Sequence, residues 1–187
     1  EIFPILAVGG ELIISGDNKD FNQLLNLCES TEVTVLSTNP YLLDFLNSSL
    51  SAYELKLRIL ISGGDVLKVN QVNNLVSKFS VYNTYGPTES TVCATYYKVK
   101  GNEGIMPIGS PISNRKIRIA NGKQLLSKGA IGEILIAGKG LAKEYINLPE
   151  TTKESFVEIE GERWYRTGDL GRCCLLYTSD AADDVQC

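Results

Sequence analysis

The sequence contains no histidine among its 187 residues. Histidine is the usual base of Ser-His-Asp and Cys-His catalysis and a frequent zinc ligand, so both catalytic arrangements are excluded from this chain and a zinc site is not expected. Cysteine is also scarce, because three of the five cysteines fall at the C-terminal end. The other two, Cys28 and Cys93, lie far apart in apolar surroundings, which is typical of reduced, buried thiols in a cytoplasmic protein.

Long apolar runs and an excess of basic residues are missing as well. No run approaches the ~18 apolar residues that a membrane-spanning helix needs. The formal net charge is −4, with 43% apolar and 21% charged residues. Nucleic-acid-binding proteins normally carry a basic face, which this balance does not favour. The composition therefore predicts a soluble globular protein that binds neither nucleic acid nor a membrane.

The C-terminal end differs in character from the rest of the chain. Residues 174–184 resemble the translation of a transposase adaptor that is used to prepare sequencing libraries. We therefore expect residues 173–187 to be a non-native tail, comparable to a fusion scar. A divergent native end is the alternative interpretation.

Residues 1–104 alternate short apolar runs with longer amphipathic ones. The pattern predicts strands at 11–14, 33–36 and 57–61, and helices at 21–29, 40–46 and 68–79. This alternation is typical of an α/β fold with a mostly parallel sheet and flanking helices. Ligands of such sheets bind at the carboxyl ends of the strands, so we expect the functional residues in the polar segments found there.

Residues 105–172 follow a different pattern. Strands are predicted at 116–120 and 132–137, and a helix at 149–155, with turn signals at Asn121-Gly122 and Lys128-Gly129. This part is predicted to be all-β, in the form of a small distorted barrel. No flexible linker separates it from residues 1–104, so we expect both parts to belong to one folding unit.

Three polar runs with glycines are candidates for a ligand site. Residues 83–89 read Asn-Thr-Tyr-Gly-Pro-Thr-Glu, in which a carboxylate beside a hydroxyl suits a hard cation that bridges phosphates. Residues 165–170 read Tyr-Arg-Thr-Gly-Asp-Leu, in which the aspartate is suited to a ribose diol. Residues 62–65 read Ser-Gly-Gly-Asp and lack the lysine of a Walker loop. Taken singly, each run could be an ordinary turn or a helix cap.

Together and in this order, the runs resemble the signatures of the adenylate-forming superfamily. Residues 132–149 resemble most closely the adenylation domains of nonribosomal peptide synthetases, although Glu144 replaces a usual glycine. The resemblance implies part of the large N-terminal region of such a domain. It also implies an enzyme that uses ATP and Mg²⁺ to convert an amino acid into aminoacyl-AMP with release of pyrophosphate. The aminoacyl group would then load the phosphopantetheine thiol of a carrier protein, with carrier and condensation domains as partners.

The resemblance assigns roles to individual residues. It implies that Glu89 holds Mg²⁺ and that Thr88 contacts the α-phosphate of ATP, which makes these two the expected catalytic residues. It implies that Tyr85 stacks beside the adenine, that Asn83 hydrogen-bonds the adenine, and that Asp169 binds the ribose. The remaining nucleotide-binding residues are expected to be Gly63, Gly64, Thr84 and Gly86.

The resemblance also indicates the pocket for the acyl substrate. The residues that it implies there are Ser37, Ile61, Gly63, Thr84, Val92 and Cys93. Three of them are small, and a pocket with small walls leaves volume that only a large side chain fills with favourable contacts. A bulky amino acid, of aromatic size, is therefore expected as the substrate. The alternative is that these residues belong to an ordinary core.

The family's phosphate-binding loop and an acidic ligand of the substrate amino group are expected upstream of Glu1. A C-terminal lid with a catalytic lysine is expected downstream. We therefore expect the parent protein to be an enzyme and this segment alone to be inactive. Two alternatives stay open, namely an acyl- or aryl-CoA ligase of the same superfamily and a non-catalytic nucleotide-binding relic. Neighbouring carrier and condensation domains would exclude the first alternative, and an intact upstream phosphate loop would exclude the second.

Overall fold

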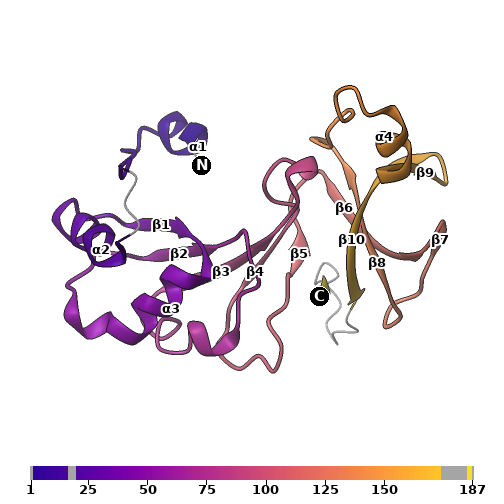
Figure 1. Cartoon of the computed structure of the whole chain (residues 1–187). Coiled ribbons are helices and arrows are strands. Elements are labelled where there is room, and N and C mark those ends of the chain that lie inside the picture. Colours follow the sequence, from indigo (N-terminus) through magenta and orange to yellow (C-terminus); the bar gives the residue numbers. More distant parts are fainter. Residues whose placement is uncertain (1, 17–19, 174–184, 187) are drawn as a thin grey trace.

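The computed structural model describes residues 2–16, 20–173 and 185–186, which form two sheets that follow one another along the chain (Figure 1). The first part contains α1 (Ile2–Ala7), α2 (Phe21–Ser30), β1 (Val35–Thr38), α3 (Pro40–Ser49), η1 (Leu50–Ala52), β2 (Ile59–Ser62), η2 (Val69–Gln71), β3 (Ser80–Tyr85), η3 (Thr88–Ser90), β4 (Thr95–Lys98) and β5 (Ser110–Pro111). The second part contains β6 (Arg115–Asn121), β7 (Gln124–Leu125), β8 (Ile131–Gly138), α4 (Pro149–Ser155), β9 (Phe156–Ile159), β10 (Glu162–Cys173) and β11 (Val185–Gln186).

Sheet A has the strand order β1-β2-β3-β4-β5 and combines two kinds of pairing. Strands β1, β2 and β3 run parallel, whereas β4 and β5 are each antiparallel to the preceding strand. The connection from β3 to β4 spans residues 86–94, which is shorter than the crossover of about a dozen residues that a parallel pair needs. The predicted α/β class is confirmed, and the sheet as a whole is mixed.

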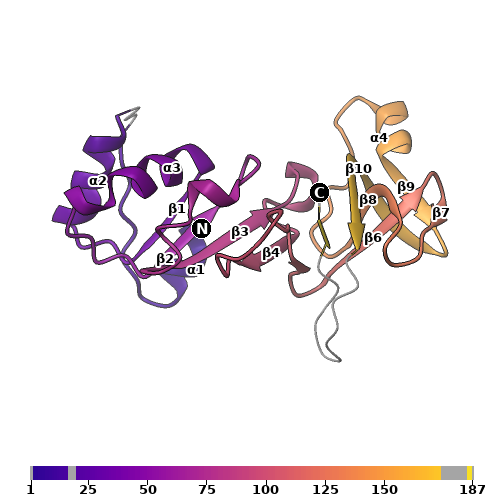
Figure 2. The ribbon, with the colours of Figure 1, turned by 90° about the horizontal axis from the view of Figure 1, so that it is seen from below.

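Helices α2 and α3 cover one face of sheet A (Figure 2). Helix α3 begins where the sequence predicts it, because the Asn39 side chain accepts a hydrogen bond from the Leu42 amide and Pro40 occupies the first turn. Leu42 is buried against Leu60 of β2 and Val81 of β3, which share this face of the sheet. This apolar core holds β2 and β3 in place, and both strands end in residues of the predicted site.

Two predictions for this part were wrong. Residues 11–14 form no strand, and β1 is the terminal strand of sheet A among the described residues. The predicted helix 68–79 is reduced to η2 and a series of turns. One of its amides is bound by asparagine side chains, because the Asn74 amide donates to Oδ1 of both Asn73 and Asn47 at 2.9 Å. Such side-chain bonds compete with the backbone hydrogen bonds of a helix.

Sheet B is antiparallel, with the strand order β11-β10-β8-β6-β7 and with β9 paired to β10 (Figure 1). Strand β8 alternates between two apolar clusters, since Ile134 and Ile136 pack on one side and Leu135 and Ala137 on the other. The strands predicted at 116–120 and 132–137 lie within β6 and β8, and the predicted helix 149–155 coincides with α4. The predicted all-β part is therefore confirmed.

The two sheets meet in a shared apolar cluster. Ala94 and Ile108, which precede β4 and β5, pack with Ile119 of β6 and Ile134 of β8. Strand β5 lies beyond residue 104 and nevertheless pairs with β4 of sheet A. The predicted division between residues 104 and 105 stays a prediction.

The predicted tail, residues 173–187, lies outside the described residues except for residue 173 and residues 185–186. Among the described residues, Cys28 is buried, Cys93 is half-buried, and both are free thiols. None of the helices in the described ranges has the length and apolar character that a membrane crossing requires.

Candidate active site

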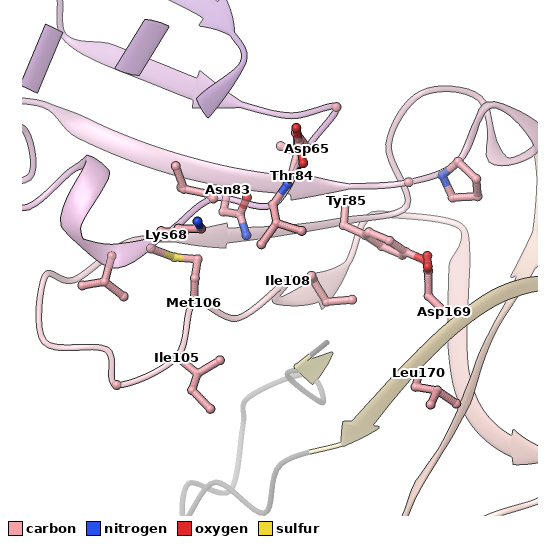
Figure 3. Close-up of a pocket in the computed structure, with 17 residues that line it drawn as sticks. Asp65, Lys68, Asn83, Thr84, Tyr85, Ile105, Met106, Ile108, Asp169 and Leu170 are labelled. Atoms are coloured by element: carbon pink, nitrogen blue, oxygen red, sulfur yellow. Dashed lines mark hydrogen bonds between the residues drawn. The ribbon is translucent and has the colours of Figure 1, made fainter. Parts of the chain in front are cut away.

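A cavity of about 740 Å³ lies where the carboxyl end of β3 faces the middle of β10 (Figure 3). Four segments form its wall. They are residues 64–69 after β2, residues 83–87 at the end of β3, the segment before β5 with Gly104, Ile105, Met106 and Ile108, and Asp169 with Leu170 from β10. Of the nine predicted catalytic and nucleotide-binding residues, six lie in this wall, namely Gly64, Asn83, Thr84, Tyr85, Gly86 and Asp169.

The polar residues at the end of β3 are each tied to a different neighbour. Nδ2 of the buried Asn83 donates to the Pro107 carbonyl at 2.8 Å, which connects β3 to the segment before β5. Oγ1 of Thr84 donates to the carbonyl of Ser62 on β2 at 2.8 Å. These bonds fix the side chains that the strand presents to the cavity.

Tyr85 and Asp169 join the two sheets at the cavity. The Tyr85 hydroxyl donates to Oδ2 of Asp169 at 2.6 Å, although 84 positions separate the two residues in the sequence (Figure 3). Asp169 lies in a bulge of β10, since the pairing of β10 with β8 shifts between Arg166 and Leu170. The bulge turns the Asp169 carboxylate toward β3, where it meets the residues of the first polar run.

Glu89 lies in η3, just past the cavity wall at Pro87. The Tyr145 hydroxyl donates to Oε1 of Glu89 at 2.5 Å. This bond, with a further contribution from the Tyr165 hydroxyl, lowers the pKa of the Glu89 carboxyl. Burial raises the pKa of Tyr165, and the neighbouring Tyr145 and Glu89 raise it further. Glu89 is therefore ionised at neutral pH, and the raised pKa keeps the Tyr165 phenol protonated beside it.

Hydrogen bonds join the loop that carries Glu89 to the segment after β8. The Ala142 amide donates to the Glu89 carbonyl at 2.7 Å, and the Thr91 hydroxyl donates to the Gly140 carbonyl at 2.7 Å. The Arg115 guanidinium donates a hydrogen bond to the Ser90 carbonyl of the same loop. Residues 138–142 thus support the loop and contribute no side chain to the cavity wall.

A divalent cation fits this site only if most of its ligands come from a bound phosphate or from water. The part of the chain that the structure describes holds no cluster of three or more His, Cys, Asp or Glu side chains. Glu89 is the acidic ligand that the loop offers, with the exposed Thr88 hydroxyl beside it. Mg²⁺ commonly binds in this way, through one or two carboxylates and substrate phosphates.

The predicted acyl-pocket residues fall into two groups. Ser37 and Ile61 are neighbours in register on β1 and β2, and both are half-buried on the face opposite the α2–α3 core. Gly63 follows β2 directly, and a Cβ atom there would lie 2.7 Å from Oγ1 of Thr84. Of the six predicted residues, Thr84 lines the cavity.

The second group, Val92 and Cys93, lies on the loop between η3 and β4. Val92 is 76% exposed and has a φ of 69°, and the preceding Thr91 has a φ of 58°. Two successive β-branched residues in the left-handed region are unusual and indicate a strained loop. Cys93 packs beside Gly86, where an added Cβ atom would lie 2.8 Å from the Cys93 Cα. Burial raises the pKa of the Cys93 thiol.

Sequence reasoning missed several residues of the site. Tyr145 appeared only as part of the Gly132–Pro149 resemblance, with no role assigned to it. Ile105 and Met106 gave no signal, because they lie in an irregular segment that Glu103 shapes. The Glu103 carboxylate accepts hydrogen bonds from the amides of residues 100 and 101 and from the Tyr97 hydroxyl.

Comparison with known proteins identifies relatives of this chain. A sequence model of the AMP-binding enzyme family matches residues 1–146. The chain is 43% identical over 180 residues to bacitracin synthase 2 of Bacillus licheniformis, covering 92% of this chain and 7% of the synthase. It is 36% identical over 181 residues to tyrocidine synthase 1 of Brevibacillus parabrevis, covering 92% of this chain and 16% of that synthase.

A solved structure has the same fold. It is that of PA1221, an NRPS protein containing adenylation and PCP domains, with a TM-score of 0.83 and 29% identity over 94% of this chain and 38% of PA1221. The chain thus spans well under half the length of each of these proteins.

Proposed function

The chain belongs to the family of AMP-binding enzymes, and we propose that it forms part of the nucleotide site of a longer peptide synthetase. In this proposal the whole protein activates an amino acid with ATP. The substrate carboxylate attacks the α-phosphorus, the bond to the β-phosphate breaks, and pyrophosphate leaves as aminoacyl-AMP forms. The observation that carries the proposal is the contact between Tyr85 and Asp169, which brings both polar runs to one cavity.

The residues of the cavity wall suit a nucleotide. The exposed Asp169 carboxylate has two oxygens, and the Tyr85 hydroxyl occupies one hydrogen-bonding position on Oδ2. The remaining positions are available to the hydroxyls of a ribose. The Tyr85 ring and the apolar side chains of Ile105 and Met106 give the cavity faces against which a flat base packs. Asn83 provides an amide at the end of the same strand.

The phosphates would lie toward η3. The Thr88 hydroxyl is exposed there and suits a hydrogen bond to the α-phosphate. Glu89 would hold Mg²⁺, for which its ionised state is the required one. When bound, the cation neutralises phosphate charge that develops during the reaction. Tyr145 keeps the Glu89 carboxylate oriented by donating to one of its oxygens.

The finer assignments are predictions. Ser37, Gly63 and Thr84 are small, and we propose that they leave room for the side chain of a large, aromatic amino acid. Because the relatives are peptide synthases, we propose transfer to the phosphopantetheine thiol of a carrier domain and a condensation domain as a further partner. A cytoplasmic location agrees with the free thiols of Cys28 and Cys93.

The test is ATP–pyrophosphate exchange by the full-length protein that contains this chain, measured with each of the amino acids. Exchange that depends on one amino acid is expected. Transfer of the acyl group to a carrier thiol, and not to free coenzyme A, separates a synthetase from a CoA ligase. Absence of exchange with every amino acid and every carboxylic acid tested would contradict the proposal and favour a nucleotide-binding relic.

A further inference from the structure

A single carboxylate holds the bulge that presents Asp169. Glu133 lies on β8 opposite Leu170, the residue at which β10 resumes its pairing after the bulge. Its side chain is 14% exposed, which is low for a glutamate. Glu133 does not line the cavity, so any effect on a ligand there acts through the bulge.

Both oxygens of the Glu133 carboxylate bind the bulge. Oε2 accepts hydrogen bonds from Nε and Nη2 of Arg166 at 3.0 and 2.8 Å. Oε1 accepts a hydrogen bond from the Gly168 amide at 3.1 Å. Gly168 has a φ of 77°, a conformation that glycine adopts without strain. One carboxylate therefore connects the start of the bulge to its tip.

Thr167 connects the bulge to Asp169 by hydrogen bonds. The Thr167 hydroxyl donates to the Ile134 carbonyl at 2.9 Å and accepts from the Asp169 amide at 3.0 Å. The Asp169 backbone is thus held from the β8 side, while its carboxylate receives the Tyr85 hydroxyl from the cavity side. Loss of the Glu133 bonds would free Gly168 and let the Asp169 carboxylate leave this position.

We propose that Glu133 is a positioning residue for nucleotide binding, because it sets the bulge so that the Asp169 carboxylate faces the cavity. The inference rests on the proposed function, in which Asp169 binds the ribose hydroxyls. The negative charge of Glu133 is essential to the role. Three N–H groups point at it, and the amide of a glutamine would place a donor against at least one of them.

The test compares ATP with 2′-deoxy-ATP and 3′-deoxy-ATP in pyrophosphate exchange by the full-length protein. The wild type is expected to prefer ATP because Asp169 binds both hydroxyls. Glu133→Gln is expected to raise KM for ATP ~10-fold and to leave kcat and the KM of the amino acid nearly unchanged. The variant should also lose most of the preference for ATP over the two deoxy nucleotides. A merely structural defect would weaken all three nucleotides alike and leave the preference intact.

Three further variants complete the experiment. Glu162→Gln is the matched control. It removes the exposed 2.8 Å ion pair between Glu162 and Lys116 at the start of β10, the strand that carries the bulge. It is expected to behave like the wild type. Arg166→Lys keeps the charge and loses the two-point contact, so it should lose part of the preference for ATP and serves as the milder variant if Glu133→Gln does not fold.

Asp169→Asn separates the inference from the proposed function. If Asp169→Asn loses the preference for ATP while folded Glu133→Gln and Arg166→Lys keep it, Glu133 has no positioning role and the proposed function stands. If Asp169→Asn itself keeps the preference, the ribose assignment and the role of Glu133 both fall. Melting temperatures identify the folded variants.

Discussion

The Tyr145 hydroxyl lies 2.5 Å from Oε1 of Glu89, and 56 positions separate the two residues in the sequence. The bond spans the two parts of the chain, since Glu89 follows β3 of sheet A and Tyr145 precedes α4 beside sheet B. It defines the orientation of the acidic side chain that is predicted to hold the cation.

Replacement of Glu89 by glutamine removes the charge and keeps the shape of the side chain. In the full-length protein we expect Glu89→Gln to lower the rate of ATP–pyrophosphate exchange by ~10²-fold or more, which is the scale for loss of one electrostatic stabiliser. Glu150→Gln is a suitable control, because the exposed Glu150 pairs with Lys153 on α4 and does not line the cavity. Exchange by Glu89→Gln within a few-fold of the wild type would disprove the role of Glu89.

Tyr145→Phe tests how the carboxylate is kept ionised. The Tyr145 bond is the largest cause of the lowered pKa of Glu89. The stabilisation that a lowered carboxyl pKa provides is present above the ordinary pKa of glutamate and is lost as the pH falls through the lowered value. Without Tyr145 the pKa of Glu89 rises, so the acid limb of the kcat/KM profile should move to higher pH. Activity at neutral pH should fall ~10-fold, because the ionised carboxylate loses the bond that orients it.

The control for Tyr145→Phe is Tyr53→Phe, which removes a 2.9 Å bond from the Tyr53 hydroxyl to Asn22, far from the cavity. Its pH profile should match that of the wild type. An unshifted acid limb in Tyr145→Phe would show that Tyr145 does not control the ionisation of Glu89.

The excised segment 1–172 is expected to be inactive and to fold poorly. Strand β1 is the terminal strand of sheet A among the described residues, and helix α1 contributes no buried residue. An open parallel edge and an unpacked apolar helix favour aggregation. Thermal melting and pyrophosphate exchange of the purified segment provide the measurement, with the full-length protein as reference. A soluble, cooperatively melting and active segment would contradict this expectation.

Gly63→Leu tests the pocket for the acyl group. A Cβ atom at Gly63 would lie 2.7 Å from Oγ1 of Thr84, so a larger side chain must displace Thr84, which we assign to the acyl pocket. We expect KM for a bulky amino acid to rise at least ~10-fold, because a hydrophobic pocket discriminates by ~1–3 kcal/mol per methylene. KM for a small amino acid should change much less, which serves as the internal control. A wild-type preference for glycine or alanine would contradict the roomy pocket.

Local patterns in the sequence determined much of the fold. Asn39 and Pro40 predict the start of α3, and the apolar alternation of residues 132–137 predicts β8, because capping and side-chain period are properties of neighbouring residues. The resemblance around residues 83–89 and Asp169 likewise singled out side chains that the structure brings to one cavity. In contrast, the helix predicted at 68–79 did not form, since Asn47 from α3 captures an amide of that segment.

The tertiary structure alone decided which residues support the site. Glu133 and Tyr145 gave no signal of their own, because their partners Gly168 and Glu89 lie 35 and 56 positions away. The contacts of Glu133 depend on the register of β8 with β10 and on the bulge after Arg166. The contact of Tyr145 depends on how the segment after β8 lies against η3. A register is set by the packing of whole strands on a common core, so no short stretch of sequence contains it.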